Sequence, residues 1–173
     1  MAADLEHAVV CRRSDWGCYV GRYSVGAGLG WSRFREQTAF WPKLQIEAGL
    51  LNHISVELVA GTINVQQLYH SLNAAPTIIV GAGLRYYPFE LYRGLVLNVT
   101  LVDHLYRQDL SNQRYTAQAA ALSTLGWRWR PRDYAGSFVL GAGVQKELSG
   151  GTRIQPAFET EIAVDFNSDS LFF

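Results

Sequence analysis

Apolar and polar side chains alternate with a period of two through most of this chain, from about residue 19 to residue 166. Such alternation is typical of β-strands with two unlike faces, and helical periodicity is almost absent. Short segments rich in Gly, Asn, Pro and Ser separate the strands, so successive strands are expected to form hairpins. The eight expected strands cover about 19–33, 43–50, 54–61, 77–87, 95–106, 115–130, 138–147 and 154–166.

Eight successive antiparallel strands predict an all-β protein, an up-and-down barrel whose interior is filled by side chains. A chain of 173 residues is long enough for one such domain. We expect residues 1–18 to form an N-terminal leader, 19–166 the barrel and 167–173 a C-terminal tail. Cys11 and Cys18 lie in the leader and are predicted to form a disulfide, with two free thiols as the alternative.

The alternation alone does not say which face is inside. A soluble, lipocalin-like lipid carrier would turn its apolar face toward a cavity, whereas a transmembrane barrel would turn it toward lipid. Composition favours the second arrangement, because charged residues make up only 17% of the chain and the only lysines are Lys43 and Lys146. The polar faces consist largely of Gly, Ser, Thr and Gln, which suits a packed interior better than a surface in water.

A glycine-rich segment recurs in the pattern, as VGAGL at 25–29 and 80–84 and as LGAGV at 140–144. A phosphate-binding loop needs its glycines at a strand-to-helix turn, whereas these glycines fall in the middle of strands on the polar face. We therefore expect them to leave room for large side chains inside the barrel.

Aromatic side chains lie near the ends of the apolar faces. In the strand expected at 115–130, Tyr115 lies at one end and the pair Trp127 and Trp129 at the other, which corresponds to about 30 Å along a barrel axis. Tyr and Trp favour the headgroup region of a membrane. The predicted interfacial belts contain Tyr19, Trp31, Tyr86, Tyr115, Trp127 and Trp129.

In this architecture the chain resembles the small eight-stranded outer-membrane β-barrels of Gram-negative bacteria, the class that holds the OmpA transmembrane domain and the OmpX and OmpW types. Such proteins end in alternating apolar residues closed by Phe, as at Phe158, Ile162, Val164 and Phe166, with the terminal Phe173 as a second candidate. The resemblance implies outer-membrane lipid and the barrel-assembly machinery as partners. It also implies an outer-membrane location with both termini on the periplasmic side, and the first residues, MAADLEH, do not form a signal peptide.

Charged residues on the polar faces are expected to form a network in the barrel lumen. Buried charges must be paired, so the network is expected to fill the barrel and fix its register, with a narrow path for ions or small solutes as the alternative. The network is predicted to contain Arg22, Glu47, Glu57, Arg85, His104, Arg128, Glu159 and Glu161.

Catalytic chemistry has little support in the sequence. The family precedent would be a lipid A deacylase or palmitoyltransferase, but the only tempting pair is His70 and Ser71, which point to opposite faces if they lie on a strand. No catalytic residue, cofactor or metal site is predicted, and with equal numbers of basic and acidic residues no nucleic acid is expected.

The preferred function is therefore a non-enzymatic membrane anchor, or one subunit of a larger envelope assembly joined through its termini. Loop-like segments at 32–42 and 64–76 could also bind a partner. Two residues fit the apolar face poorly. Pro156 is expected near a rim or a bulge, and Asp103 is expected near the headgroups.

Overall fold

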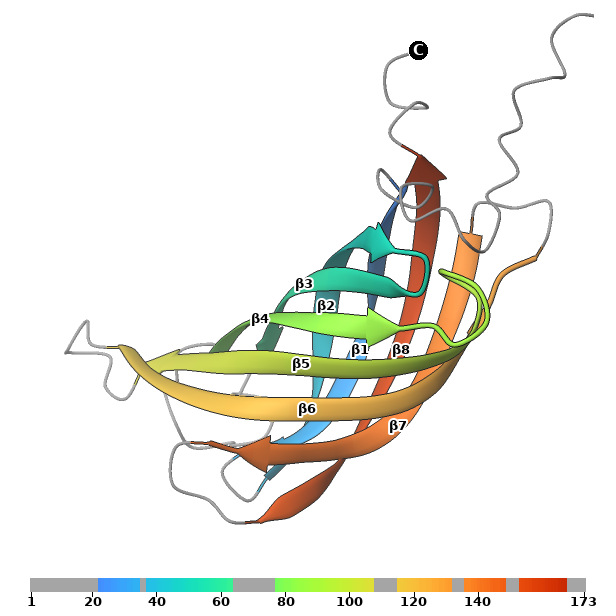
Figure 1. The fold of residues 1–173 in the computed structure, drawn as a ribbon. Coiled ribbons are helices and arrows are strands. Elements are labelled where there is room, and N and C mark those ends of the chain that lie inside the picture. Colours follow the sequence, from blue (N-terminus) through green and yellow to red (C-terminus); the bar gives the residue numbers. More distant parts are fainter. Residues whose placement is uncertain are drawn as a thin grey trace, which may run out of the picture.

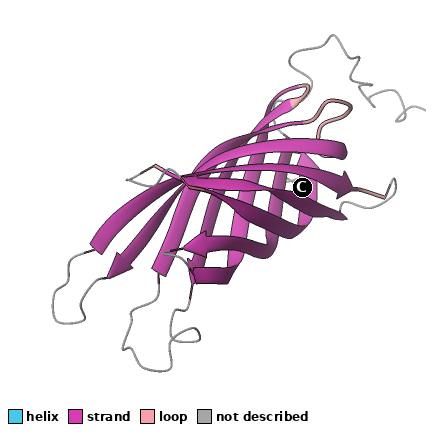
Figure 2. Cartoon of the chain, turned by 90° about the horizontal axis from the view of Figure 1, so that it is seen from below, coloured by secondary structure: helices cyan, strands magenta, loops and turns pink. Residues whose placement is uncertain are grey.

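A computed structural model describes residues 22–34, 37–63, 77–107, 115–131, 136–148 and 153–167. These residues form eight strands and no helix (Figures 1 and 2). The strands are β1 (Arg22–Phe34), β2 (Gln37–Leu51), β3 (Ile54–Ile63), β4 (Thr77–Tyr86), β5 (Gly94–Arg107), β6 (Tyr115–Trp129), β7 (Gly136–Glu147) and β8 (Ile154–Asn167).

Each strand pairs antiparallel with the next, and β8 pairs with β1 to close the barrel. If paired residues are followed around the wall from Gly94 on β5, the path returns to the same strand at His104, ten residues further along. With strands about 4.8 Å apart, this stagger corresponds to a strand tilt of about 40°. An eight-stranded barrel of this kind has an interior just wide enough for side chains. The structure confirms the predicted all-β, up-and-down barrel.

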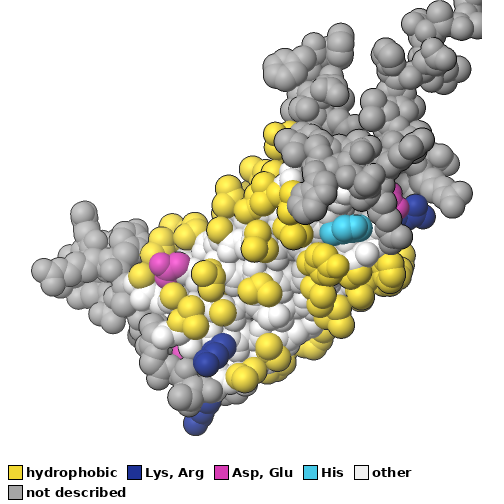
Figure 3. Space-filling model, in the orientation of Figure 1, with side chains coloured by type: hydrophobic (Ala, Val, Ile, Leu, Met, Phe, Trp, Pro, Cys, Tyr) yellow, Lys and Arg dark blue, Asp and Glu magenta, His cyan; other side chains and the backbone are white. Residues whose placement is uncertain are grey.

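The apolar faces of the strands point outward and the polar faces point inward. Leu58, Leu101 and Ile162 have exposed fractions of 58%, 58% and 70%, whereas the charged Glu47 and Arg128 are completely buried. Hydrophobic side chains spread over the described part of the face in Figure 3, with few charged side chains among them. The sidedness therefore differs from that of a soluble carrier, in which the apolar side chains would fill the centre.

Strand β2 begins at Gln37, earlier than the expected position near residue 43. It pairs with β1 as far as Phe34 opposite Gln37, so most of the segment 32–42, which was expected to be a loop, lies within the barrel wall. Period-two reading missed this part because the apolar side chain of Trp41 points inward and is buried. Pro156, on β8, is exposed on the outer face, as its position in the pattern predicted.

The two ends of the barrel differ in how they are closed. We call the end that holds Arg22 and Asn167 the terminal end, and the opposite end the distal end. At the terminal end, residues 87–93 connect β4 to β5 and turn tightly, with Tyr92 and Gly94 at positive φ angles of 64° and 80°. The backbone amide of Tyr87 donates to the carbonyl oxygen of His53, which ties this connection to the β2–β3 turn.

No helix in the described residues is long and apolar enough to cross a membrane.

Candidate functional site in the barrel interior

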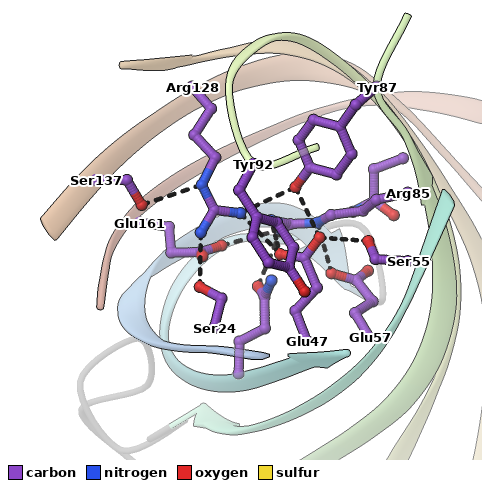
Figure 4. A network of polar contacts seen from close by, with 12 residues as sticks. Ser24, Glu47, Ser55, Glu57, Arg85, Tyr87, Tyr92, Arg128, Ser137 and Glu161 are labelled. Carbon is purple, nitrogen blue, oxygen red and sulfur yellow. Dashed lines mark hydrogen bonds and ion pairs between the residues drawn. The ribbon is translucent and has the colours of Figure 1, made fainter. Parts of the chain in front are cut away.

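Arg128 is the centre of a polar network at the terminal half of the interior (Figure 4). A guanidinium has five N–H donors, and all five are used here. Nε donates to Ser137 Oγ at 3.0 Å, Nη1 to Glu47 Oε2 at 2.8 Å and Tyr87 Oη at 2.9 Å, and Nη2 to Ser24 Oγ and Asp165 Oδ1, both at 2.6 Å. These partners come from β7, β2, the β4–β5 connection, β1 and β8, so one side chain joins most of the circumference.

Arg85 on β4 forms the second centre. Its Nε lies 2.8 Å from Glu57 Oε2, and its Nη2 lies 2.9 Å from Glu161 Oε2. Longer contacts of 3.4 Å and 3.6 Å reach Glu47 and Glu159. Arg85 thus lies among four carboxylates from three strands, and the attraction offsets the desolvation of these groups only because they are so close.

Lys43 on β2 completes the set of buried cations. Its Nζ lies 2.7 Å from Glu159 Oε2 and 3.6 Å from Glu161 Oε2, and it donates to Gln45 Oε1 at 3.2 Å. The Thr124 hydroxyl donates to the other oxygen of Glu159 at 2.6 Å. Lys43 therefore links β2 with β8 across the lumen.

Hydroxyl groups donate hydrogen bonds to the buried carboxylates in addition to the ion pairs. Ser55 donates to Glu47, and Thr100 donates to Glu57. The Tyr87 hydroxyl donates to Glu47 Oε1 at 2.7 Å while it accepts from Arg128. A buried polar network of this kind stabilises a barrel only if its members are satisfied together.

The connection between β4 and β5 contributes two tyrosines to this network. Burial raises the pKa of Tyr87 well above its usual range, so the phenol keeps its proton and acts as a donor to Glu47. Burial also raises the pKa of Tyr92, whose hydroxyl donates to the carbonyl oxygen of Arg22 at 2.9 Å. The Tyr92 ring lies 4.8 Å from the guanidinium carbon of Arg128, within cation–π distance.

Apolar layers border the polar network at both ends. At the terminal end the layer contains Tyr87, Leu91, Tyr92, Val96 and Val139, all buried. Toward the distal end the layer contains Trp41, Val59, Ile79, Val102 and Ala120, also buried. The described interior is therefore packed with side chains, and its ionic centre is shielded from water on both sides.

Glycines make room for the largest interior ring. A Cβ atom at Gly30 would overlap the Trp41 indole, and one at Gly61 would lie 2.5 Å from its Cε3 atom. The Trp41 ring thus packs directly against the backbone of the glycines on β1 and β3. This close approach is a physical reason for mid-strand glycine on the polar face.

The structure brings six of the eight predicted network residues into direct contact: Glu47, Glu57, Arg85, Arg128, Glu159 and Glu161. Arg22 lies at the terminal end and is half-buried. His104 is buried but lies two residues beyond Val102, on the distal side of the apolar layer, where its Nδ1 is 3.2 Å from the carbonyl oxygen of Gln118.

Sequence reasoning missed the hydroxyl and amide members of the network, and also Lys43, Asp165, Tyr87 and Tyr92. Of these last four, two are charged residues on strands and two are tyrosines. The first two share the inward parity of their neighbours on β2 and β8, so the strand pattern could have found them. The tyrosines lie on a connection, whose path into the lumen has no periodic signal.

The described residues of the predicted aromatic belts lie on the outer surface. Tyr86, Trp127 and Trp129 are exposed near the terminal end, and the Trp129 ring stacks on Phe138 with 5.8 Å between ring centroids. Trp31 is half-buried further toward the distal end, against Phe158. Tyr19 and the Tyr115 side chain lie outside the described residues, as do Cys11 and Cys18.

No group of three His, Cys, Asp or Glu side chains in the described ranges could hold a metal ion. The interior carboxylates face Arg85, Arg128 and Lys43 instead. His53, at the terminal end, lies with its Nδ1 2.8 Å from the carbonyl oxygen of Tyr87. His70 and Ser71 lie outside the described residues.

Comparison with solved structures finds the same architecture. The N-terminal β-barrel domain of OprF from Pseudomonas aeruginosa matches 85% of this chain and 98% of that domain, with a TM-score of 0.57 and 14% sequence identity. The chain has the fold of the small eight-stranded outer-membrane β-barrels. Neisserial surface protein A, NspA, matches with a TM-score of 0.49 and 14% identity over 84% of this chain and 97% of NspA. Ail, the attachment invasion locus protein of Yersinia pestis, matches with a TM-score of 0.45 and 15% identity over 85% of this chain and 99% of Ail.

No protein-family model and no curated protein matches this barrel. At 14% identity, the likeness to the OprF domain concerns the fold alone.

Proposed function

We propose that this protein is an integral outer-membrane β-barrel with a structural, non-enzymatic role, either as a membrane anchor or as a subunit of an envelope assembly. The observation that carries the proposal is the sidedness of the wall. Leu44, Leu58 and Leu84 are more than half exposed on the outside, while the ion pairs of Arg85, Arg128 and Lys43 are buried inside. An apolar outer wall is stable in lipid and is an aggregation liability in water.

The aromatic side chains agree with this placement. Tyr86 on β4 and Trp127 and Trp129 on β6 all lie near the terminal end. Trp31 lies eight residues along β1 from Tyr23, which is itself near that end. At a tilt of about 40°, eight residues span roughly 20 Å along the axis, slightly less than the apolar band of about 25 Å in outer-membrane barrels. We propose these residues as the described parts of the two interfacial belts.

Folding into lipid tests the proposal. The refolded protein is expected to require detergent or lipid for solubility, and to migrate faster on a gel when unheated than after boiling. A folded monomer that stays soluble after detergent removal would overturn the proposal. Measurement of β-structure by circular dichroism in the same samples separates folded from aggregated protein.

The alternative of an ion or solute path is not favoured by the interior. Glu47, Arg85 and Arg128 each have an exposed fraction of 1% or less, and apolar layers border them on both sides. We expect no channel steps in planar bilayers that contain the folded protein. Steady conductance that disappears in an Arg128→Met variant would favour the pore.

The non-enzymatic part of the proposal is tested separately. Lipid A from cells that carry the protein is expected to have the same acyl chains as lipid A from cells that carry the empty vector, as measured by mass spectrometry. Loss or gain of an acyl chain, abolished by His70→Ala, would support the lipid-modifying alternative. Cross-linking in cells with and without residues 1–18 and 168–173 tests the assembly role, because partners held through the termini are lost on truncation.

A further inference from the structure

The outer face of β6 differs from its neighbours in the size of its side chains. Ala117, Ala119 and Ser123 are exposed and Ala121 is half-exposed, so the distal half of this strand presents small side chains outward. Larger side chains lie on either side of it, such as Leu101 on β5 and Leu148 directly after β7, with exposed fractions of 58% and 53%. Small residues let two backbones approach closely in lipid, where burial from water provides no driving force for association.

Two charged side chains flank this strip on the lipid-facing side. Asp103 on β5 points outward and is half-buried, and its Oδ1 atom is buried without a hydrogen-bond partner in the described part of the chain. Lys146 on β7 points outward and is exposed. Charges on the lipid face of a barrel are unfavourable unless they lie near the headgroups or are paired.

Asp103 and Lys146 do not pair within one chain. In the sheet register, Asp103 lies opposite Ala119 on β6, and Lys146 lies opposite Ala121 on the same strand. The two charges are therefore separated by one strand and by two residues along it. With strands about 4.8 Å apart and a rise of about 3.3 Å per residue, their Cα atoms are roughly 12 Å apart along the wall. Neither has an ion pair within the described residues.

The barrel tilt places the two charges at the same depth. At a tilt of about 40°, each step from one strand to the next, from β5 toward β7, shifts the position about 3 Å toward the distal end. A step of two residues along β7 toward its first residue shifts the position about 5 Å toward the terminal end. The Cα atoms of Asp103 and Lys146 therefore differ in depth by only about 1–2 Å. The same reasoning from the register places Trp31 within about 3 Å of this depth.

We propose that a second copy of this chain docks on this face, giving a two-fold symmetric dimer in the membrane. A two-fold axis parallel to the barrel axis and passing over Ala120 exchanges the β5 and β7 sides of the contact. Asp103 of each copy then faces Lys146 of the other at matching depth. The proposal rests on the membrane location proposed above.

The shapes at the contact agree with this arrangement. Ala119 and Ala121 of each copy lie next to the axis, where two convex barrels are closest. Because the axis preserves depth, Ala119 of one copy lies level with Ala119 of the other. The longer side chains of Asp103 and Lys146 lie to either side, where the walls curve apart. Leu101 and Leu148 lie close to the axis, toward the terminal and distal ends respectively, and provide apolar contact. Two reciprocal ion pairs at the membrane interface select this orientation over others.

Charge reversal tests the pairing. Asp103→Lys alone and Lys146→Asp alone each place like charges opposite one another, and each is expected to weaken dimerisation by at least about tenfold in lipid vesicles, measured by energy transfer between labelled copies. An equal mixture of the two variants has complementary charges again and is expected to dimerise as the unmodified protein does. If the single reversals leave dimerisation unchanged, or the mixture fails to restore it, the proposed pairing is wrong.

Cross-linking tests the position of the contact. In a chain with Cys11→Ser and Cys18→Ser, Ala119→Cys is expected to form a disulfide-linked dimer under mild oxidation in vesicles. The control is Ala60→Cys, which is also an exposed outward alanine but lies three strands away on β3. Equal yields from both variants would overturn the proposal. Each sample is also tested for heat-modifiable migration, so a folded but monomeric barrel contradicts only the dimer, whereas loss of the membrane-dependent fold contradicts the proposed function.

Discussion

Replacement of Arg128 by Met tests whether the interior network holds the wall together. The substitution keeps the volume and the apolar stem of the side chain and removes the charge and five donated hydrogen bonds. Glu47 and Asp165 remain buried, and each then has only a longer contact of 3.4 Å to another cation, Arg85 and Arg130 respectively. Loss of one partner of a buried pair costs about 3–5 kcal/mol, and we expect a loss of stability in that range.

Arg130→Met provides the matched control. Arg130 is the second residue after Arg128, retains a 29% exposed side chain and makes one contact of 3.4 Å to Asp165. A partly exposed pair of this kind contributes about 0–1 kcal/mol. Both variants are to be unfolded by urea in lipid vesicles, with the transition followed by tryptophan fluorescence and by the unheated gel band. Conditions are chosen in which folding and unfolding curves coincide.

A second variant separates a lost interaction from a lost fold. Arg128→Met combined with Glu47→Gln also removes the charge of a carboxylate that has lost its closest cation. The double variant is therefore expected to lose less stability than the sum of the two single variants. The reasoning is refuted if Arg128→Met loses no more stability than Arg130→Met. It is also refuted if the two substitutions are simply additive.

Three further changes test other parts of the structure. Gly143→Ala places a methyl group against the backbone of β6 and is expected to reduce the yield of folded barrel in the gel assay, whereas Gly136→Ala, whose Cβ would have only a 3.9 Å contact, is expected to leave it unchanged. Leu58→Arg puts a charge on the middle of the outer wall and is expected to destabilise the barrel by about 2–4 kcal/mol in vesicles, measured by urea unfolding. An unchanged free energy of unfolding would argue against contact of Leu58 with lipid. Tyr87→Phe removes hydrogen bonds with a buried carboxylate and a buried guanidinium, and is expected to cost about 1–3 kcal/mol in the same measurement; a change below that range would mean that the β4–β5 connection contributes little to the network.

The strand pattern was sufficient to predict most of the barrel wall, the first residues of β2 excepted. Because successive side chains on a strand point to opposite faces, the parity that places Leu58 outside also places Glu57 inside, and the same holds for Trp127 and Arg128. The large contrast in polarity between the two faces shows which side chains of each strand point inward. The identity of the partners inside the lumen was not accessible, since it depends on the stagger between strands that are far apart in sequence.

The pattern failed where apolar residues face inward. Trp41, Val59 and Ile79 interrupt the polar interior near the distal end, and the resulting layer separates His104 from the network it was expected to join. The part played by Tyr92 was equally hidden, because it depends on a turn with φ of 64° at that residue rather than on strand periodicity.

Quenching of single tryptophans by brominated lipids tests the central claim most directly, since that claim is which side of the wall meets lipid. Of the five tryptophans in the chain, one at a time is kept and the others are replaced by Phe. Trp127, 43% exposed on the outer face, is expected to be strongly quenched by lipids brominated along the acyl chain, and Trp41, 4% exposed in the interior, is expected to be protected. Strong quenching of Trp41 together with protection of Trp127 would contradict the account.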